Sequence, residues 1–192
     1  MNLAAYAGLA VRLVNSATEP AGDDPLRCAV ALRAWLADLP FPAGPVTSQD
    51  LSRLRTLRAD FAAVFQMAAA GDVTEVTDRL NTLMMIHPVH PILVSHDGEP
   101  WHLHLADSGS LTDRYAAAAV ISLAVLVDES GTGRLGVCAI TACDRVFIDG
   151  SNNHSRRYCP GHSAARGNLT VIRRPSRAVT AGTGHPPATA AS

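Results

Sequence analysis

Three of the four cysteines and one histidine lie in the last third of the chain, at spacings that suit a metal ion. Four residues separate Cys138 from Cys143, fifteen more precede Cys159, and two residues separate Cys159 from His162. Two short turns that offer thiolate or imidazole ligands, joined by a hairpin-length spacer, are typical of tetrahedral zinc sites. The pattern predicts Zn²⁺ held by these four residues, with His154 in the spacer as the alternative fourth ligand.

The segment that carries these ligands is basic. Residues 134–192 contain eight arginines and two acidic residues, a balance of +6, whereas residues 1–133 contain eight arginines and fifteen acidic residues, a balance of −7. The net charge of −1 therefore hides an acidic part joined to a basic part. Lysine is absent, and arginine offers planar donors for phosphate and guanine. The basic segment predicts nucleic-acid binding, with a merely solvated basic surface as the alternative. The candidate contacts are Arg145, Arg156, Arg157, Arg166, Arg173 and Arg174.

A small hairpin is expected to position the ligands. Residues 145–149 alternate like a strand, and residues 152–158 read as a turn and a return strand. Val146 and Ile148 should share one face of the strand, with Phe147 on the other. Such a hairpin buries too little surface to fold alone, so a metal would supply much of its folding free energy, roughly 10–16 kcal/mol in comparable zinc peptides.

The region before the hairpin reads as mostly helical. Asp24 and Pro25 suit the start of a helix, Ser48 is expected to cap a long amphipathic helix, and Gly71 is expected to end it. Two strands are expected between residues 91 and 106, around an Asp97–Gly98 turn. The predicted helices cover 3–17, 25–38, the segment from 48 to 70, 74–85, 111–127 and, capped by Ser163, 164–174.

These elements predict an α+β protein, with a mostly helical N-terminal domain that holds a small antiparallel sheet, followed by a zinc-ribbon-like hairpin and a short helix. The expected division is 1–130, 135–175 and a disordered tail over 176–192. The chain has 192 residues, of which 47% are hydrophobic, and no apolar run reaches eighteen residues. Because the N-terminus lacks a basic start and Arg12 interrupts it, we expect a cytoplasmic protein with reduced thiols.

The basic segment resembles the CGNR zinc-finger family, through the FID strand, the SNNHSRRYC run and Arg166. The family's last cysteine falls on Ser163 here, so the neighbouring His162 would have to complete the site. The upstream region is similar to the ABATE domain of stress-induced transcription regulators, in VRLVNSA, LRTLR and the hairpin with Trp101. The resemblance implies a zinc-ribbon DNA-binding transcriptional regulator whose N-terminal domain senses a small-molecule effector or forms a homodimer.

Other signals are weaker. We expect Cys28 to be a buried core thiol, and Trp35 and Trp101 to be core or pocket-wall residues. The chain has no Gly-rich phosphate loop, nucleophile elbow or HExxH motif, so we expect no enzyme. Because no apolar run reaches eighteen residues, we expect no membrane association. The alternatives to a DNA-binding protein are an RNA-binding module, a protein-docking ribbon with an apolar patch, and a small-molecule enzyme with convergent titratable groups. The enzyme would use the histidine-rich zone of His87, His90, His96, His102 and His104.

Overall fold

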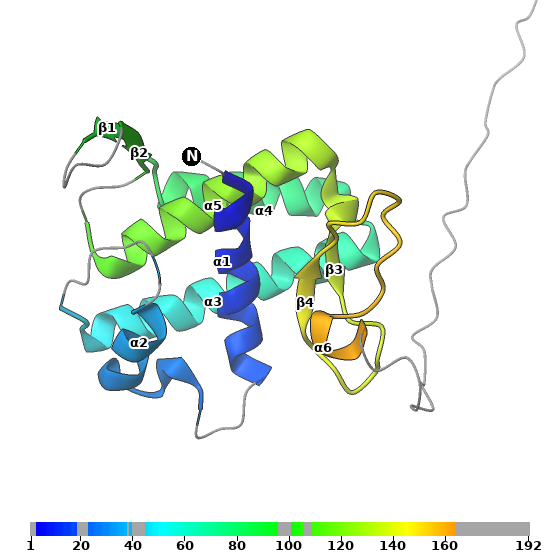
Figure 1. Ribbon diagram of the computed structural model, residues 1–192, viewed down its shortest axis with the longest axis horizontal. Helices are drawn as coiled ribbons and strands as arrows, with labels where there is room; N and C mark the ends of the chain where they lie inside the picture. The colour runs from blue at the N-terminus through cyan, green and yellow to red at the C-terminus, as the bar shows by residue number, and fades with distance from the viewer. Residues whose placement is uncertain are drawn as a thin grey trace, which may run out of the picture.

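The computed structural model describes residues 3–18, 23–37, 39, 45–95, 101–105 and 109–163, and it has the predicted α+β class (Figure 1). The α-helices are α1 (Leu3–Asn15), α2 (Ala29–Leu36), α3 (Ser48–Ala70), α4 (Val73–Ile86), α5 (Leu111–Ser130) and α6 (Pro160–Ser163). Short 3₁₀ turns are η1 (Ser16–Thr18), η2 (Pro25–Arg27) and η3 (Thr132–Arg134). The strands are β1 (Ile92–Val94), β2 (His102–His104), β3 (Leu135–Val137) and β4 (Val146–Ile148).

The long helices begin at polar caps. Thr47, rather than the expected Ser48, caps α3, because its side chain accepts a hydrogen bond from the Asp50 N–H while the Asp50 carboxylate accepts one from the Thr47 N–H. Gly71 ends α3 in the left-handed region, with φ of 83°, as its position predicted. Ser110 and Asp113 form the same reciprocal cap at the start of α5.

The helix predicted over 25–38 is divided. The Asp24 side chain accepts from the Leu26 N–H and caps η2, and the extended backbone of Cys28 then separates η2 from α2. Cys28 is exposed, so the prediction of a buried core thiol was wrong. Its place between two short helical pieces turns its side chain away from the core.

The core lies where α1 crosses α3 and α5 (Figure 1). Leu13, Phe61, Phe65 and Tyr115 are almost fully buried, and the Tyr115 hydroxyl donates to the Leu9 carbonyl at 2.8 Å. Residues 115–120 of α5 are all buried, as their apolar run predicted. Each large apolar side chain removed from water contributes about 1.5–3 kcal/mol, so this crossing is the main source of stability.

Two antiparallel hairpins flank the helices. In the first, β1 pairs with β2, and Trp101 just before β2 is 70% exposed, so the prediction of a core or pocket-wall residue was wrong for Trp101. In the second, β4 pairs with β3 and not with the predicted return strand at 152–158, which forms a loop. No helix in the described part of the chain is long and apolar enough to cross a membrane.

The second hairpin faces two ways. Val146 and Ile148 pack with the helical core, together with Leu135 of β3, whereas Phe147 packs with the three clustered cysteines. The predicted alternation of these side chains along β4 is therefore confirmed. β4 thus joins the main core on one face and the cysteine cluster on the other.

Candidate metal centre

The four predicted ligands come from two tight turns beside the second hairpin. Cys138 directly follows β3, and Cys143 closes a turn in which its N–H donates to the Ile140 carbonyl at 3.0 Å. Cys159 precedes α6, and its carbonyl accepts from the N–H groups of His162 and Ser163 at 3.0 and 2.9 Å. This single helical turn brings the side chains of Cys159 and His162 to the same point.

The ligand atoms have the spacing of a tetrahedral zinc site. The His162 Nδ1 lies 3.4 Å from the Sγ atoms of both Cys138 and Cys159, and the Cys143 Sγ lies 4.0 Å from the Cys159 Sγ. All four ligand atoms lie within 4.8 Å of one another. Zinc–sulfur bonds of about 2.3 Å and a zinc–nitrogen bond of about 2.0 Å give tetrahedron edges of about 3.5–3.8 Å. The side chains present therefore fit Zn²⁺.

The three thiols are buried and His162 is half-buried. Burial raises the pKa of the Cys138 thiol, but backbone hydrogen bonds with Cys159 and Ile140 outweigh burial and lower that pKa to about 7. Burial and the neighbouring sulfurs raise the pKa of Cys143 to about 11. Three thiolates this close repel one another unless a cation lies between them, and a bound divalent ion would supply that charge.

His154, the alternative fourth ligand, lies elsewhere. It is exposed in the loop between β4 and Cys159, with φ of 50°, and it is not part of the ligand group. Ser163, which directly follows His162, donates its hydroxyl to the Pro160 carbonyl at 3.0 Å. His162 is thus the nitrogen donor that the structure places with the three cysteines.

The comparisons agree with this geometry. Residues 7–129 match the ABATE family, described as "Putative stress-induced transcription regulator". The chain belongs to the ABATE family. Residues 134–168 match the CGNR zinc finger, so the metal centre lies within this second match. No curated protein matches the sequence.

The zinc finger surrounds its ligand group with apolar side chains. Phe147 is buried against the cysteines, and Ile140 and Tyr158 pack beside them. The Phe147 ring lies over Gly136, so close that a Cβ on Gly136 would come within 2.5 Å of the ring. A Cβ at this position would have to displace the ring, because strand pairing sets Gly136 directly opposite Phe147. The apolar shell limits access of water to the sulfurs, which favours metal retention.

The spacer between the ligand pairs is an ordered loop built on Asp149. The Asp149 carboxylate accepts from the Ser151 N–H at 2.8 Å, from the Ser151 hydroxyl at 2.6 Å and from the Arg156 N–H at 2.8 Å. The Ser151 hydroxyl bond, with these backbone bonds, lowers the pKa of Asp149 to about 2. Arg134 also donates to the carbonyls of Asp149 and Ser151. This carboxylate, rather than strand pairing, fixes the loop, which explains why the predicted return strand does not form.

The candidate nucleic-acid contacts divide into two groups. Arg156 and Arg157 are exposed in the Asp149 loop, and Arg145 is half-buried just before β4. The Arg156 guanidinium lies 5.9 Å from the centre of the Phe147 ring, and the Ala139 N–H donates to the Arg157 carbonyl at 2.8 Å. The structure therefore places both exposed arginines beside the metal centre. Arg166, Arg173 and Arg174 lie outside the described residues.

Asn15 joins the helical part of the chain to the zinc finger. Its side-chain amide donates to the Val146 carbonyl at 3.0 Å, and its side-chain oxygen accepts from the Val146 N–H at 2.8 Å. The end of α1 thus supplies the hydrogen bonds that a neighbouring strand would give to the outer edge of β4. Asn15 belongs to the VRLVNSA run that resembles ABATE, but nothing in the sequence indicated its partner.

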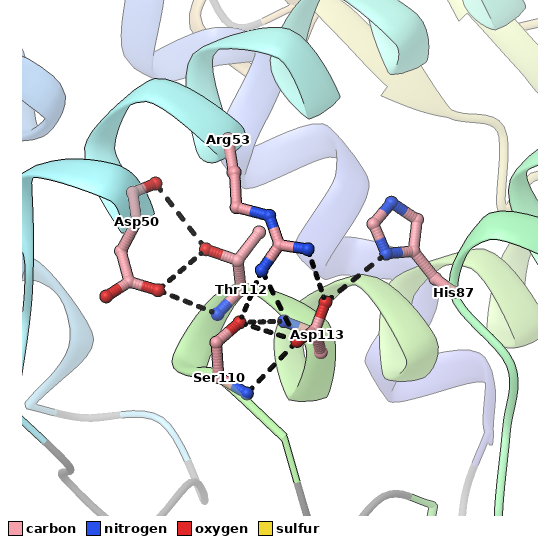
Figure 2. A network of polar contacts seen from close by, with 6 residues as sticks. All are labelled: Asp50, Arg53, His87, Ser110, Thr112 and Asp113. Carbon is pink, nitrogen blue, oxygen red and sulfur yellow. Dashed lines mark hydrogen bonds and ion pairs between the residues drawn. The ribbon is translucent and has the colours of Figure 1, made fainter.

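A second polar network joins the starts of α3 and α5 (Figure 2). Asp50 is buried and accepts from the Thr112 hydroxyl at 3.0 Å, while Arg53 and Asp113 form an ion pair at 3.4 Å. His87 lies 3.9 Å from Asp113, and burial lowers the pKa of His87. A cavity of about 310 Å³ adjoins this network. Its lining includes Pro45, Thr47, Asp50, Arg53, Ser110 and Arg114.

The histidine-rich zone does not form a metal site in the described part of the chain. There, the cysteine and His162 group is the one set of three or more ligand side chains close enough to share an ion. His87 belongs to the Asp113 network, and His104 lies on β2. His96 falls outside the described residues, as does the side chain of His102.

Proposed function

We propose that the chain is a zinc-dependent DNA-binding transcription regulator, in which the CGNR zinc finger contacts DNA and the ABATE part controls it. The observation that carries this proposal is the position of Arg156 and Arg157. Both are exposed on the loop that begins at Asp149, directly after β4, and ends at the ligand Cys159. Metal binding at Cys159 would therefore anchor one end of the loop that presents the two guanidinium groups, while Asp149 holds the other end.

The proposed role of zinc is structural. Three thiolates and one imidazole complete a tetrahedron and leave no open position for substrate, whereas catalytic zinc keeps one. Zinc would hold together a hairpin whose own strands have three residues each, and would thereby supply part of its folding free energy. The zinc ion would accordingly take part in no catalytic step.

The surface of the zinc finger favours a nucleic acid over a docked protein. A docking ribbon would expose an apolar patch, but the exposed large apolar residues of the described chain all lie before residue 104. The described zinc-finger surface offers arginines instead. An RNA ligand has the same phosphates and remains the second candidate. The cavity beside Arg53 and Arg114 is the candidate site for an effector of the ABATE part.

The test is the salt dependence of binding to labelled duplex DNA, measured by fluorescence anisotropy on zinc-loaded protein. Replacing Arg156 and Arg157 together with alanine should weaken binding and reduce the salt slope by about two units, because each lost phosphate contact removes about one. The control is the double variant of Arg27 and Arg33, which are also exposed but lie on η2 and α2.

Three outcomes separate the candidates. An unchanged slope in the Arg156 and Arg157 variant would contradict a phosphate-binding role for the loop. Tighter binding to single-stranded or duplex RNA than to DNA would transfer the proposal to RNA. Equal loss in the Arg27 and Arg33 control would show that net charge, and not the loop, governs binding.

A further inference from the structure

His154 adopts a backbone conformation that disfavours its residue type. Its φ of 50° lies in the left-handed region, and in the described part of the chain every other residue with positive φ is a glycine. Histidine tolerates this region better than most residues, but its Cβ is crowded there and glycine fits better. Residues held in such conformations are concentrated at functional sites. A histidine kept at this position indicates that the imidazole itself has a role.

The fold does not use the imidazole of His154. The residue is exposed, and no described residue shares a hydrogen bond or an ion pair with its side chain. It lies outside the zinc ligand group, and it packs in neither of the two apolar clusters. His154 therefore stabilises neither the core nor the metal centre, and its side chain is available to a ligand.

The tip of the loop that carries His154 is closed by its own hydrogen bonds. The Ser155 N–H donates to the Ser151 hydroxyl at 3.1 Å, and the Ser155 hydroxyl donates to the Asn153 side-chain oxygen at 2.7 Å. Asp149 holds the base of the loop through the backbone N–H of Ser151. A tip closed in this way is no wider than a two-stranded ribbon, which the major groove of DNA admits. Because the tip is already ordered, binding would cost little conformational entropy.

We propose that His154 contacts a base edge in the major groove of DNA and is a specificity-determining residue of the zinc finger. This inference rests on the proposed DNA binding, in which Arg156 and Arg157 of the same loop contact phosphates. Phosphate contacts position a protein on DNA, whereas contacts to base edges give it a sequence preference. Residues 152–157 are all exposed and none of them is acidic, so the tip and the two arginines can meet the same stretch of DNA.

The chemistry of the imidazole selects a purine as the base. A histidine ring carries an N–H donor in either protonation state. Adenine and guanine both present the N7 acceptor in the major groove, whereas cytosine presents a donor, and thymine has a methyl group beside its acceptor. An N–H of His154 that donates to N7 would therefore favour a purine at one position of the DNA site.

The experiment selects a duplex from a library of randomised DNA with the zinc-loaded full chain, and then compares the affinities for the selected duplex and a scrambled one. Wild type should bind the selected duplex at least about tenfold more tightly. His154→Gly should reduce this ratio by at least about fivefold, because a base contact is lost, and should keep the salt slope, because the phosphate contacts remain. Replacing the contacted purine by its 7-deaza analogue, which lacks N7, should weaken binding of wild type but not of His154→Gly.

Glycine at position 154 separates this role from a structural one. Because glycine adopts positive φ readily, His154→Gly should bind zinc as tightly as wild type and melt within about 2 °C of it, so a lost preference would not come from a damaged loop. The matched control is His90→Ala, which should keep the full sequence preference. His90 is also exposed, but it lies two residues before β1, and the β1–β2 hairpin is at the end of the molecule opposite β3 and β4 (Figure 1).

The outcomes distinguish this inference from the proposed function. A His154→Gly variant with the wild-type ratio, an equal loss in His90→Ala, or 7-deaza analogues that leave wild-type binding unchanged at every purine would each overturn the role of His154. None of these results would affect the salt slope of the Arg156 and Arg157 variant, which tests DNA binding itself. A wild-type protein that binds no duplex would overturn both.

Discussion

Removing the side chain of Asn15, which is half-buried, should strongly destabilise the protein. Asn15 makes both hydrogen bonds to Val146, at 3.0 and 2.8 Å, and Val146 is 1% exposed. Asn15→Ala would leave one buried N–H and one buried carbonyl without these partners. Each unsatisfied buried group costs about 1–3 kcal/mol, and partial access of water at the strand edge reduces that cost. We therefore expect a loss of about 2–4 kcal/mol in the free energy of unfolding.

The effect should also reach the metal centre, because Val146 lies three residues after Cys143 and the Cys138 N–H donates to the Arg145 carbonyl. A loosened β4 would hold both cysteines less firmly. The assay is urea unfolding of the zinc-loaded protein followed by circular dichroism, with zinc affinity measured by chelator competition. Asn15→Ala should lower both quantities.

Asn81→Ala is the control, since Asn81 is exposed on α4 and its loss should change the free energy of unfolding by less than about 0.5 kcal/mol. An Asn15→Ala variant as stable as this control would refute the inference that α1 and the zinc finger are joined through these two bonds.

Two further changes test the geometry of the metal centre. His162→Ala should weaken zinc binding by at least about tenfold in a chelator competition, and His154→Ala should leave it unchanged; the reverse result would mean that the other histidine is the ligand. Gly136→Ala should destabilise the hairpin by about 1–3 kcal/mol, because the new Cβ must displace the Phe147 ring, and an unchanged melting temperature would show that the ring moves freely.

The sequence predicted the α+β class, most helices and the side-chain alternation of β4, because apolar periodicity and caps are local signals. Local signals also explain the errors. Ser48 and Thr47 are both acceptable caps, and only the position of Asp50 selects Thr47. The predicted return strand at 152–158 does not form, because the Asp149 carboxylate accepts hydrogen bonds from the backbone N–H groups of Ser151 and Arg156. The partner of β4 is β3, which lies just before the first ligand, Cys138. No turn motif between these two strands indicated in the sequence that they pair.

Contacts between residues far apart in the sequence could not be predicted from local patterns. Nothing local indicates that Asn15 binds the Val146 backbone 131 residues away, or that Trp101 faces outward from a hairpin. The ligand spacing, in contrast, was enough to propose Cys138, Cys143, Cys159 and His162, because tetrahedral coordination constrains short turns strongly. The division between residues 1–130 and 135–175 stays a prediction, although Leu135 packs with the helical core.

The most direct test of the metal centre is zinc X-ray absorption spectroscopy on protein purified without added metal, combined with elemental analysis. The structure predicts about one zinc per chain, three sulfur ligands at about 2.3 Å and one nitrogen ligand at about 2.0 Å. Protein without zinc, or a zinc shell with two sulfurs or with bound water in place of the imidazole, would contradict the Cys138, Cys143, Cys159 and His162 site.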